Sequence, residues 1–210
     1  HTTARVSLAS DGHQADGPSE FPSISADGRW VVFSSLATNL VSGDTNAAYD
    51  VFLHDRATAG TTRVSVASGG RQLAGASAEG VVSGDGRVVV FTSLAADVVP
   101  GDANGLSDVF TYDRTTGQTR RVSLDQGNGD VVAGGGAPAL SADARTIAYE
   151  AGKRSSVYVR ATTPVIAAIS PRSGTTAAST SLRIGGEGFV PGTTVSIGGM
   201  SAVHVDGSET

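Results

Sequence analysis

The sequence contains no cysteine, and this absence excludes disulfide bridges, thiolate zinc sites and cysteine nucleophiles. Charged residues make up only 17% of the 210 residues, and 20 acidic against 15 basic side chains leave a net charge of −5. Such a chain lacks the basic surface that attracts nucleic acid or an anionic membrane. No apolar run approaches the roughly 20 residues of a membrane-spanning helix. We therefore expect neither a nucleic-acid partner nor membrane insertion.

Glycine, by contrast, is abundant, with 28 residues against only 7 prolines. The glycines follow no Gly-X-Y period, which excludes a collagen-like chain. They fall between short clusters of Val, Ile, Leu and Phe. This distribution indicates many turns between short, buried strands.

A 58-residue repeat is the strongest signal in the sequence. Arg-Val-Ser recurs at residues 5–7, 63–65 and 121–123, which are two steps of 58 residues. Other landmarks keep the same step: Asp27-Gly28 with Asp85-Gly86, Phe33 with Phe91 and Tyr149, Asp50-Val51-Phe52 with Asp108-Val109-Phe110, and Asp55-Arg56 with Asp113-Arg114. The third copy is ten residues shorter, so its Val157 aligns with Val109 at an offset of 48. We place the repeats at about 5–62, 63–120 and 121–162.

Each full repeat contains four segments with the composition of β-strands, and no segment has a helical period. In the first copy the segments are residues 21–25, 30–33, 50–54 and 61–66. Asp27-Gly28 joins the first two as a tight hairpin turn in which both residues would take positive φ. Four antiparallel strands per repeat are typical of a β-propeller blade. The fold class predicted for residues 1–162 is therefore all-β, a partial β-propeller of three blades.

The ends of the repeat array suggest that more blades exist. The chain opens on a strand of the fourth type, residues 4–8, and the third copy closes without one. Propellers contain about four to eight blades, so three cannot close a ring. We expect the missing blades elsewhere in the same parent chain.

The repeat resembles that of the TolB-type (WD-like) β-propellers of bacterial proteins. The resemblance covers residues 1–162 and lies in Pro-Ser-Ile-Ser-Ala-Asp-Gly-Arg-Trp-Val-Val-Phe at 22–33 and Asp-Val-Phe-x-x-Asp-Arg-x-Thr at 50–58. It departs in the third copy, where Ala144 replaces the turn glycine. The resemblance implies an exported protein, in the periplasm, at the cell surface or secreted. It implies no particular activity.

Residues 163–210 follow a different pattern, in which short alternating segments are separated by Gly, Pro and Ser. This pattern predicts an immunoglobulin-like β-sandwich. Its motifs, from Pro164 to Gly174 and from Leu182 to Gly199, resemble the IPT/TIG domain. An immunoglobulin-type sandwich needs roughly 100 residues, so we expect only the first half of the domain here.

Two equivalent loops carry the residues with the clearest chemistry. They contain the pattern Asp-x-Asn-x-x-x-Asp, once as Asp44, Asn46 and Asp50 and again as Asp102, Asn104 and Asp108. Oxygen donors at this spacing are ligands that calcium prefers, so the loops are candidate calcium sites and calcium the one candidate cofactor. The alternative is that the Asp and Asn side chains accept hydrogen bonds from their own loop backbone in Asx-turns. They are not EF-hands, because Tyr49 and Ser107 stand where that loop needs glycine.

Other polar and aromatic residues are more simply explained by structure. The repeated pairs Asp55-Arg56 and Asp113-Arg114 are expected to cap strand-end turns, since a catalytic acid is needed once per ring and not once per blade. The four histidines do not recur and are expected to be exposed. A further set is predicted to pack between blades, the alternative being a sugar-stacking platform: Trp30, Phe33, Phe52, Phe91 and Phe110.

The function predicted from these observations is that of a non-enzymatic binding or scaffolding module for a protein or polysaccharide. The alternative is the propeller part of a secreted hydrolase that cuts peptides or polysaccharides. A polysaccharide-cleaving site needs a non-repeating pair of carboxylates. The glutamates available in the blades are Glu20, Glu79 and Glu150, and the first two are near-equivalent in the repeat.

Overall fold

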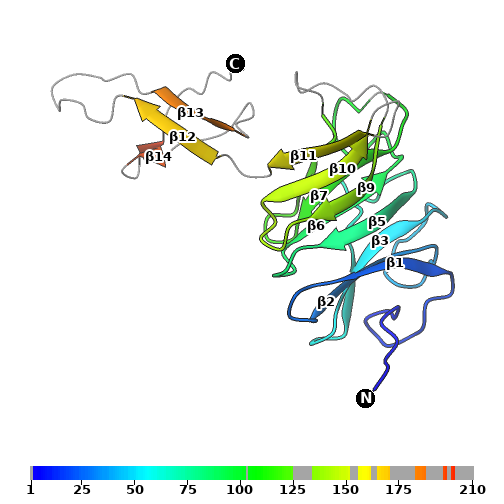
Figure 1. Ribbon diagram of the computed structural model, residues 1–210. Coiled ribbons are helices and arrows are strands. Elements are labelled where there is room, and N and C mark those ends of the chain that lie inside the picture. Colours follow the sequence, from blue (N-terminus) through cyan, green and yellow to red (C-terminus); the bar gives the residue numbers. More distant parts are fainter. Residues whose placement is uncertain are drawn as a thin grey trace. The chain divides into compact units, whose positions relative to one another are not determined.

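The computed structural model describes residues 2–102, 104–124, 134–151, 156–161, 165–170, 183–187, 196–197 and 200–201 (Figure 1). Every regular element in these ranges is a β-strand, which confirms the all-β prediction. The chain divides into two compact units, residues 1–160 and 161–210. Within the described ranges, no helix is long and apolar enough to span a membrane.

The first unit consists of three antiparallel sheets in chain order, as the repeat predicts. The first sheet has the order β1 (Ser19–Ile24), β2 (Trp30–Ser35), β3 (Asp50–Asp55) and β4 (Gly60–Arg63). The second repeats it with β5 (Ser77–Val82), β6 (Val88–Ser93), β7 (Asp108–Asp113) and β8 (Gln118–Arg121). The third contains β9 (Gly135–Leu140), β10 (Thr146–Ala151) and β11 (Ser156–Ala161). Two sheets are therefore complete four-stranded blades, and the third has three strands in the part of the chain described.

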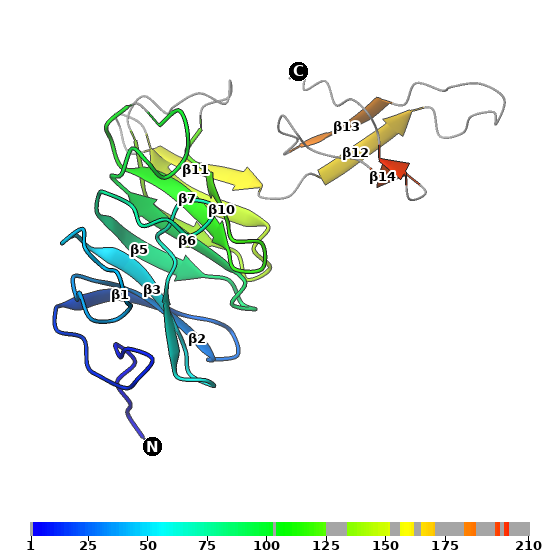
Figure 2. The same cartoon turned by 180° about the vertical axis from the view of Figure 1, so that it is seen from behind.

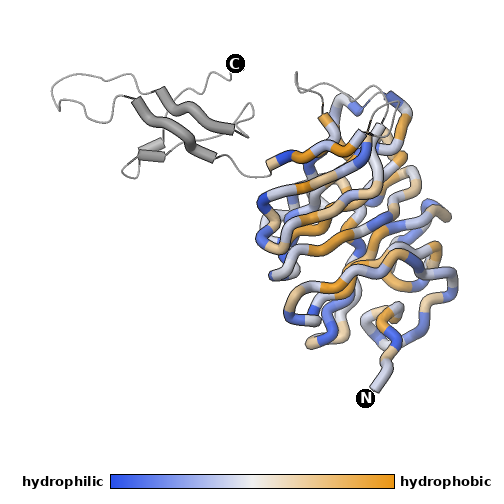
Figure 3. Tube along the Cα trace, viewed as in Figure 1, coloured by the Kyte–Doolittle hydropathy of each residue, from blue (hydrophilic) through white to orange (hydrophobic). Residues whose placement is uncertain are grey.

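The three blades stack face to face (Figures 1 and 2). The core between the first two blades includes Val32 and Leu53 of the first and Val89 and Phe91 of the second. A separate core, which contains Val90 and Ile147, joins the second blade to the third. A blade in the middle of the stack thus buries both faces, which explains why β6 begins with four consecutive apolar residues, Val88 to Phe91. The apolar stretches of the trace in Figure 3 follow these strands.

The fourth strands are shorter than predicted. β4 ends at Arg63, after which the Val64 N–H still donates to the Val51 carbonyl at 2.8 Å. The chain then leaves the sheet and turns back through an isolated bridge between Val66 and Gln72. The reason is that this segment must cross to the next blade, where the Val66 carbonyl accepts a hydrogen bond from Thr119 Oγ1 at 2.6 Å.

The prediction of a strand at residues 4–8 is wrong for the chain as the structure shows it. This segment forms only an isolated bridge between Leu8 and Gln14, the counterpart of the bridge between Val66 and Gln72. The physical reason is the absence of a sheet edge beside it: β4 and β8 each pair with the third strand of their own blade. A strand sequence without a partner strand has nothing to bond its backbone to.

The Asp-Gly hairpin is also wider than predicted. Gly28 and Gly86 have φ of 70° and the equivalent Ala144 has φ of 58°, but Asp27 does not have positive φ. Ser25 closes the loop, because its N–H donates to the Trp30 carbonyl at 2.9 Å. The Asp27 carboxylate accepts hydrogen bonds from the Ser25 hydroxyl at 2.5 Å and the Arg29 N–H at 3.0 Å. The aspartate stabilises this turn through its side chain.

In the second unit, β12 (Val165–Ser170) pairs with β13 (Arg183–Glu187), and β14 (Ser196–Ile197) pairs with β15 (Met200–Ser201). Both pairs are antiparallel. β12, β13 and β14 lie in the segments predicted to belong to an immunoglobulin-like sandwich, whereas β15 follows the last of these segments, which ends at Gly199. The rest of the predicted sandwich lies outside the described residues.

Candidate functional site

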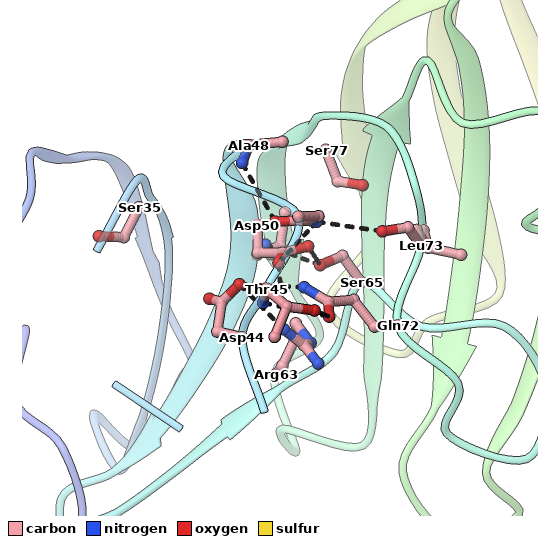
Figure 4. A network of polar contacts seen from close by, with 12 residues as sticks. Ser35, Asp44, Thr45, Ala48, Asp50, Arg63, Ser65, Gln72, Leu73 and Ser77 are labelled. Atoms are coloured by element: carbon pink, nitrogen blue, oxygen red, sulfur yellow. Dashed lines mark hydrogen bonds and ion pairs between the residues drawn. The ribbon is translucent and has the colours of Figure 1, made fainter. Parts of the chain in front are cut away.

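The predicted calcium residues of the first blade lie in a network at the end of the β2–β3 loop (Figure 4). Asp50 is fully buried at the start of β3, where it accepts hydrogen bonds from Ser65 Oγ at 2.7 Å and from Asn46 Nδ2 at 3.2 Å. The Arg63 guanidinium lies 3.3 Å from Asp50 and 3.4 Å from Asp44. The structure thus brings all three predicted residues together around one arginine.

Asn46 links the loop to its surroundings through both ends of its amide. Its Oδ1 accepts a hydrogen bond from the Ala48 N–H at 3.1 Å, which makes an Asx-turn. Its Nδ2 donates to Asp50 and, at 3.0 Å, to the Leu73 carbonyl. The oxygen that a cation would need is therefore engaged by the loop backbone.

The second blade repeats the arrangement. Asp108 accepts hydrogen bonds from Ser123 Oγ at 2.5 Å and Asn104 Nδ2 at 3.0 Å. Asn104 Oδ1 accepts one from the Leu106 N–H at 2.8 Å. Arg121 lies 3.4 Å from Asp102 and 3.9 Å from Asp108. Recurrence of this network in both full blades indicates that it fastens the long loop to the sheet.

Calcium binding by these loops stays a prediction. In both blades an arginine already supplies positive charge between the two carboxylates, so an ion would have to displace a guanidinium. No group of three or more His, Cys, Asp or Glu residues in the described ranges is arranged to hold a metal. Burial raises the pKa of Asp50, against the lowering effect of the Ser65 hydroxyl and the Arg63 charge. Full ionisation of Asp50 thus depends on these two partners.

The Asp-Arg pairs cap turns, as predicted. Asp55 accepts two hydrogen bonds of 2.8 Å from Arg29, and it also accepts from the Ala57 N–H and the Thr58 hydroxyl, each at 3.0 Å. The hydrogen bonds from Arg29 hold the pKa of Asp55 well below its usual range. Asp113 makes the equivalent contacts with Arg87 and the Thr115 N–H. A permanently ionised carboxylate clamped by a guanidinium is poorly suited to general acid catalysis.

Trp30 packs across the boundary between the first two blades. The Arg114 guanidinium lies 3.6 Å from its ring centroid and that of Arg29 lies 4.5 Å away. The ring also rests on Gly86, where an added Cβ would come within 2.0 Å of Trp30 Cδ1. The prediction of packing between blades is confirmed for Trp30, Phe91 and Phe110, which contribute to the core between the first two blades. Phe33 and Phe52 are buried instead in a separate cluster with Ala37 and Leu40 of the first blade itself.

One histidine departs from the expectation of exposure. His54 retains only 4% of its accessible surface, and its Nδ1 lies 2.8 Å from Thr61 Oγ1. Thr61 Oγ1 in turn donates to the Leu8 carbonyl at 2.5 Å, so it accepts from a protonated Nδ1. Burial lowers the pKa of His54. Sequence reasoning missed this because Tyr112 occupies the equivalent place in the second blade.

Sequence reasoning also missed a feature of the first strand of every blade. Each of these strands contains a bulge whose residue has positive φ: Phe21 at 51°, Glu79 at 55° and Ala137 at 45°. Left-handed backbone is strained for any residue with a side chain, and most for a bulky one. The three residues are one repeat apart but share no chemistry. Only the common spacing could have revealed the site.

The side chains at these bulges have different environments. Glu79 accepts a hydrogen bond from the Ala137 N–H at 2.9 Å and so joins the second blade to the third. Phe21 remains 53% exposed. Glu20, beside it on β1, and Glu150, on β10, are exposed too. Because the left-handed bulge recurs in all three blades, Phe21 is distinguished by its exposed aromatic side chain and not by its backbone.

Comparisons with known proteins give one family match. Residues 164–210 match the IPT/TIG domain. No curated protein matches the chain.

Solved structures that resemble the first unit are distant. TolB from Acinetobacter baumannii is 21% identical, with 71% of this chain and 30% of that one covered and a TM-score of 0.43. A putative TolB from Agrobacterium tumefaciens is 15% identical (68% and 44% covered, TM-score 0.44). The β-propeller domain of the Trilobed protease from Pyrococcus furiosus is 11% identical (70% and 39% covered, TM-score 0.44). This chain spans less than half the length of each, and resemblance at this level carries no argument about activity.

The chain therefore combines a stack of propeller blades, which its own sheets define, with an IPT/TIG domain at residues 164–210.

Proposed function

We propose that this chain is a non-enzymatic binding or scaffolding module of an exported bacterial protein. Its ligand would be a protein or a polysaccharide, recognised by the first strand of the first blade, β1. The combination of propeller blades with an immunoglobulin-like module supports a location outside the cytoplasm. The protein would lie in the periplasm, at the cell surface or in the medium. No helix in the described residues could span a membrane.

The observation that carries this proposal is the strained and exposed Phe21. The repeated polar groups are already engaged: Asp50 with Arg63, Asp55 with Arg29 and their counterparts in the second blade. These groups hold loops and turns and are not free to bind a ligand. Phe21 does the opposite, since it has left-handed backbone and still presents an aromatic ring to solvent. At Glu79 the same left-handed bulge holds a side chain that bonds to the next blade, whereas at Phe21 it holds an aromatic ring in solvent, which makes Phe21 a candidate binding position.

An exposed aromatic ring suits either class of ligand. Its apolar face can stack on the C–H face of a sugar or fill an apolar pocket on a protein surface. Glu20, which precedes Phe21 on β1, is exposed as well. β1 is an edge strand of its sheet, so its free backbone groups can add hydrogen bonds to a ligand.

The substitution Phe21→Gly tests the proposal because it separates function from stability. Glycine removes both the ring and the left-handed strain, so the variant should be more stable than the parent by about 1 kcal/mol, as measured by urea unfolding. Its binding should fall by tenfold or more in titrations with neutral and acidic polysaccharides and with soluble envelope proteins. Glu79→Gln, on the equivalent bulge, is the control that should keep binding. A Phe21→Gly variant that binds like the parent, or one that loses stability, contradicts the proposal.

A further inference from the structure

The two ends of the blade stack are incomplete in complementary ways. At one end, the sheet of the third blade stops at β11, and in the described residues no strand pairs with its far edge. At the other end, residues 2–5 are the counterparts of β4 by the 58-residue step, yet they are exposed and outside any sheet. One end thus lacks a fourth strand, and the other holds a fourth-strand sequence without a sheet.

The face of β11 shows the same incompleteness. Val157 is the counterpart of Val51 and Val109, which have no accessible surface because the next blade covers them. Val157 and Val159 are instead 70% and 69% exposed. Two adjacent apolar side chains on one face of an edge strand are a surface that soluble proteins normally cover.

The first blade offers the complementary face. Ile24 is 57% exposed, whereas its counterpart Val82 is 6% exposed and lies in the core between the first two blades. Val6 shows the same difference in exposure. It is only partly buried, whereas its counterparts Val64 and Val122 retain 1% and 5% of their accessible surface. These residues occupy positions that become buried when one blade follows another.

We propose that a second copy of this chain docks here, with its residues 2–7 as the fourth strand of the third blade and its first blade stacked on β11. The interface continues one that the chain already contains twice, because β4 and β8 each complete one blade and lead directly into contacts with the next. Residues 8–14 already make the matching contact with the first blade, where Ser10 Oγ accepts from the Thr61 N–H at 2.9 Å. Ser68 does the same for Thr119 of the second blade. Strand addition and blade stacking therefore occur together.

The two ends of the three described blades do not meet within one copy. Residues 2–7 adjoin the first blade, and β11 belongs to the third, with a complete blade between them (Figures 1 and 2). The contact joins two different surfaces, so it is of the head-to-tail kind, which forms closed rings when the rotation permits. Two copies would supply six blades, within the range of about four to eight that propellers contain.

The strand register of the complete blades predicts the pairing between copies. Leu53 of β3 lies opposite Thr62 of β4. By the repeat, Val159 of one copy should then lie opposite Ala4 of the other. Opposed residues on antiparallel strands have Cα atoms about 4.5–5.5 Å apart, within the range that a disulfide needs. The cysteine-free sequence makes this pairing directly testable by introduced cysteines.

The test is oxidative cross-linking of the full chain bearing Ala4→Cys and Val159→Cys, with Ala4→Cys and Val157→Cys as the matched control. Val157 points to the same face but lies two residues, about 7 Å, along the strand, out of reach. We expect disulfide-linked dimers in the first variant at a rate at least tenfold above the control. Equal cross-linking in both variants overturns the proposed pairing.

Sedimentation of the unmodified chain is the second measurement. The parent should reach about twice its 21.0 kDa mass as concentration rises to the millimolar range. The variant Val6→Asp should sediment at the monomer mass. The control Leu94→Asp should still dimerise, because Leu94 stays 59% exposed although its blade is stacked on both sides. A parent chain that remains monomeric overturns the proposal and favours further blades from the same parent chain.

Discussion

At the scale of single residues, Gly86 shows how closely the blades fit. Gly28 and Gly86 occupy the same turn with the same φ, but only Gly86 lies beneath Trp30. Around Gly28 an added Cβ would meet nothing closer than Arg56 Nη1 at 3.7 Å. Gly28→Ala should therefore cost only the left-handed backbone penalty of about 1 kcal/mol. Gly86→Ala should cost a further 1–3 kcal/mol or so, because the indole must move.

Chemical denaturation of both variants measures this difference directly. The variant Trp30→Val in the Gly86→Ala background should recover part of the loss, since the second and third blades already combine Val88 with Ala144 at these positions. Equal destabilisation by Gly28→Ala and Gly86→Ala would show that Trp30 exerts no such constraint.

His54 should make the stability of the stack depend on pH. Burial lowers its pKa in the folded state below the ordinary value of 6.5, so the unfolded chain binds the proton more readily. Stability is therefore full above pH 6.5 and is lost as the pH falls through that value. The variant His54→Tyr, which copies Tyr112 of the second blade, should lose less stability between pH 7 and 5. Parallel melting curves for parent and variant over this range would refute the assignment.

At the scale of elements, the prediction that calcium stabilises the protein concerns the β2–β3 and β6–β7 loops. The calcium hypothesis expects millimolar calcium to raise the melting temperature relative to a chelator, and it expects Asp102→Ala to remove the rise. The competing expectation is that the Asp44–Arg63 and Asp102–Arg121 contacts satisfy the loops without an ion. A melting temperature that is the same with calcium and with chelator contradicts the hypothesis, and magnesium at equal concentration controls for ionic strength.

The elements also show what the sequence can and cannot predict. Strand positions, strand order and the loss of the fourth strand in the third copy follow from alternation and repeat spacing, since buried faces and turns leave a mark on residue type. The early ends of the fourth strands could not be predicted from the sequence. Val64 and Val66 are residue types that favour strands, but contacts with the next blade redirect the backbone there. The bulge at Phe21, Glu79 and Ala137 could not be predicted from residue type, because none of these residues is the glycine that left-handed backbone favours.

At the scale of the molecule, the blades should unfold as one unit. The two cores between neighbouring blades are each shared by two blades, and the second blade contributes to both. Separating any blade would expose the apolar face of its neighbour. Residues 1–160 are therefore expected to unfold in one transition in which a defect in one blade weakens the others.

The only tryptophan makes this expectation measurable. Trp30 lies between the first two blades, so its fluorescence reports on a core to which no described residue of the third blade contributes. Ile147, in the third blade, is fully buried, and Ile147→Ala should cost about 2–4 kcal/mol. If the stack is cooperative, this substitution lowers the urea midpoint of the Trp30 signal, whereas Val157→Ala, at an exposed position of the same blade, leaves it within error. A Trp30 transition that ignores Ile147→Ala would mean that the blades unfold independently, as weakly coupled repeats do.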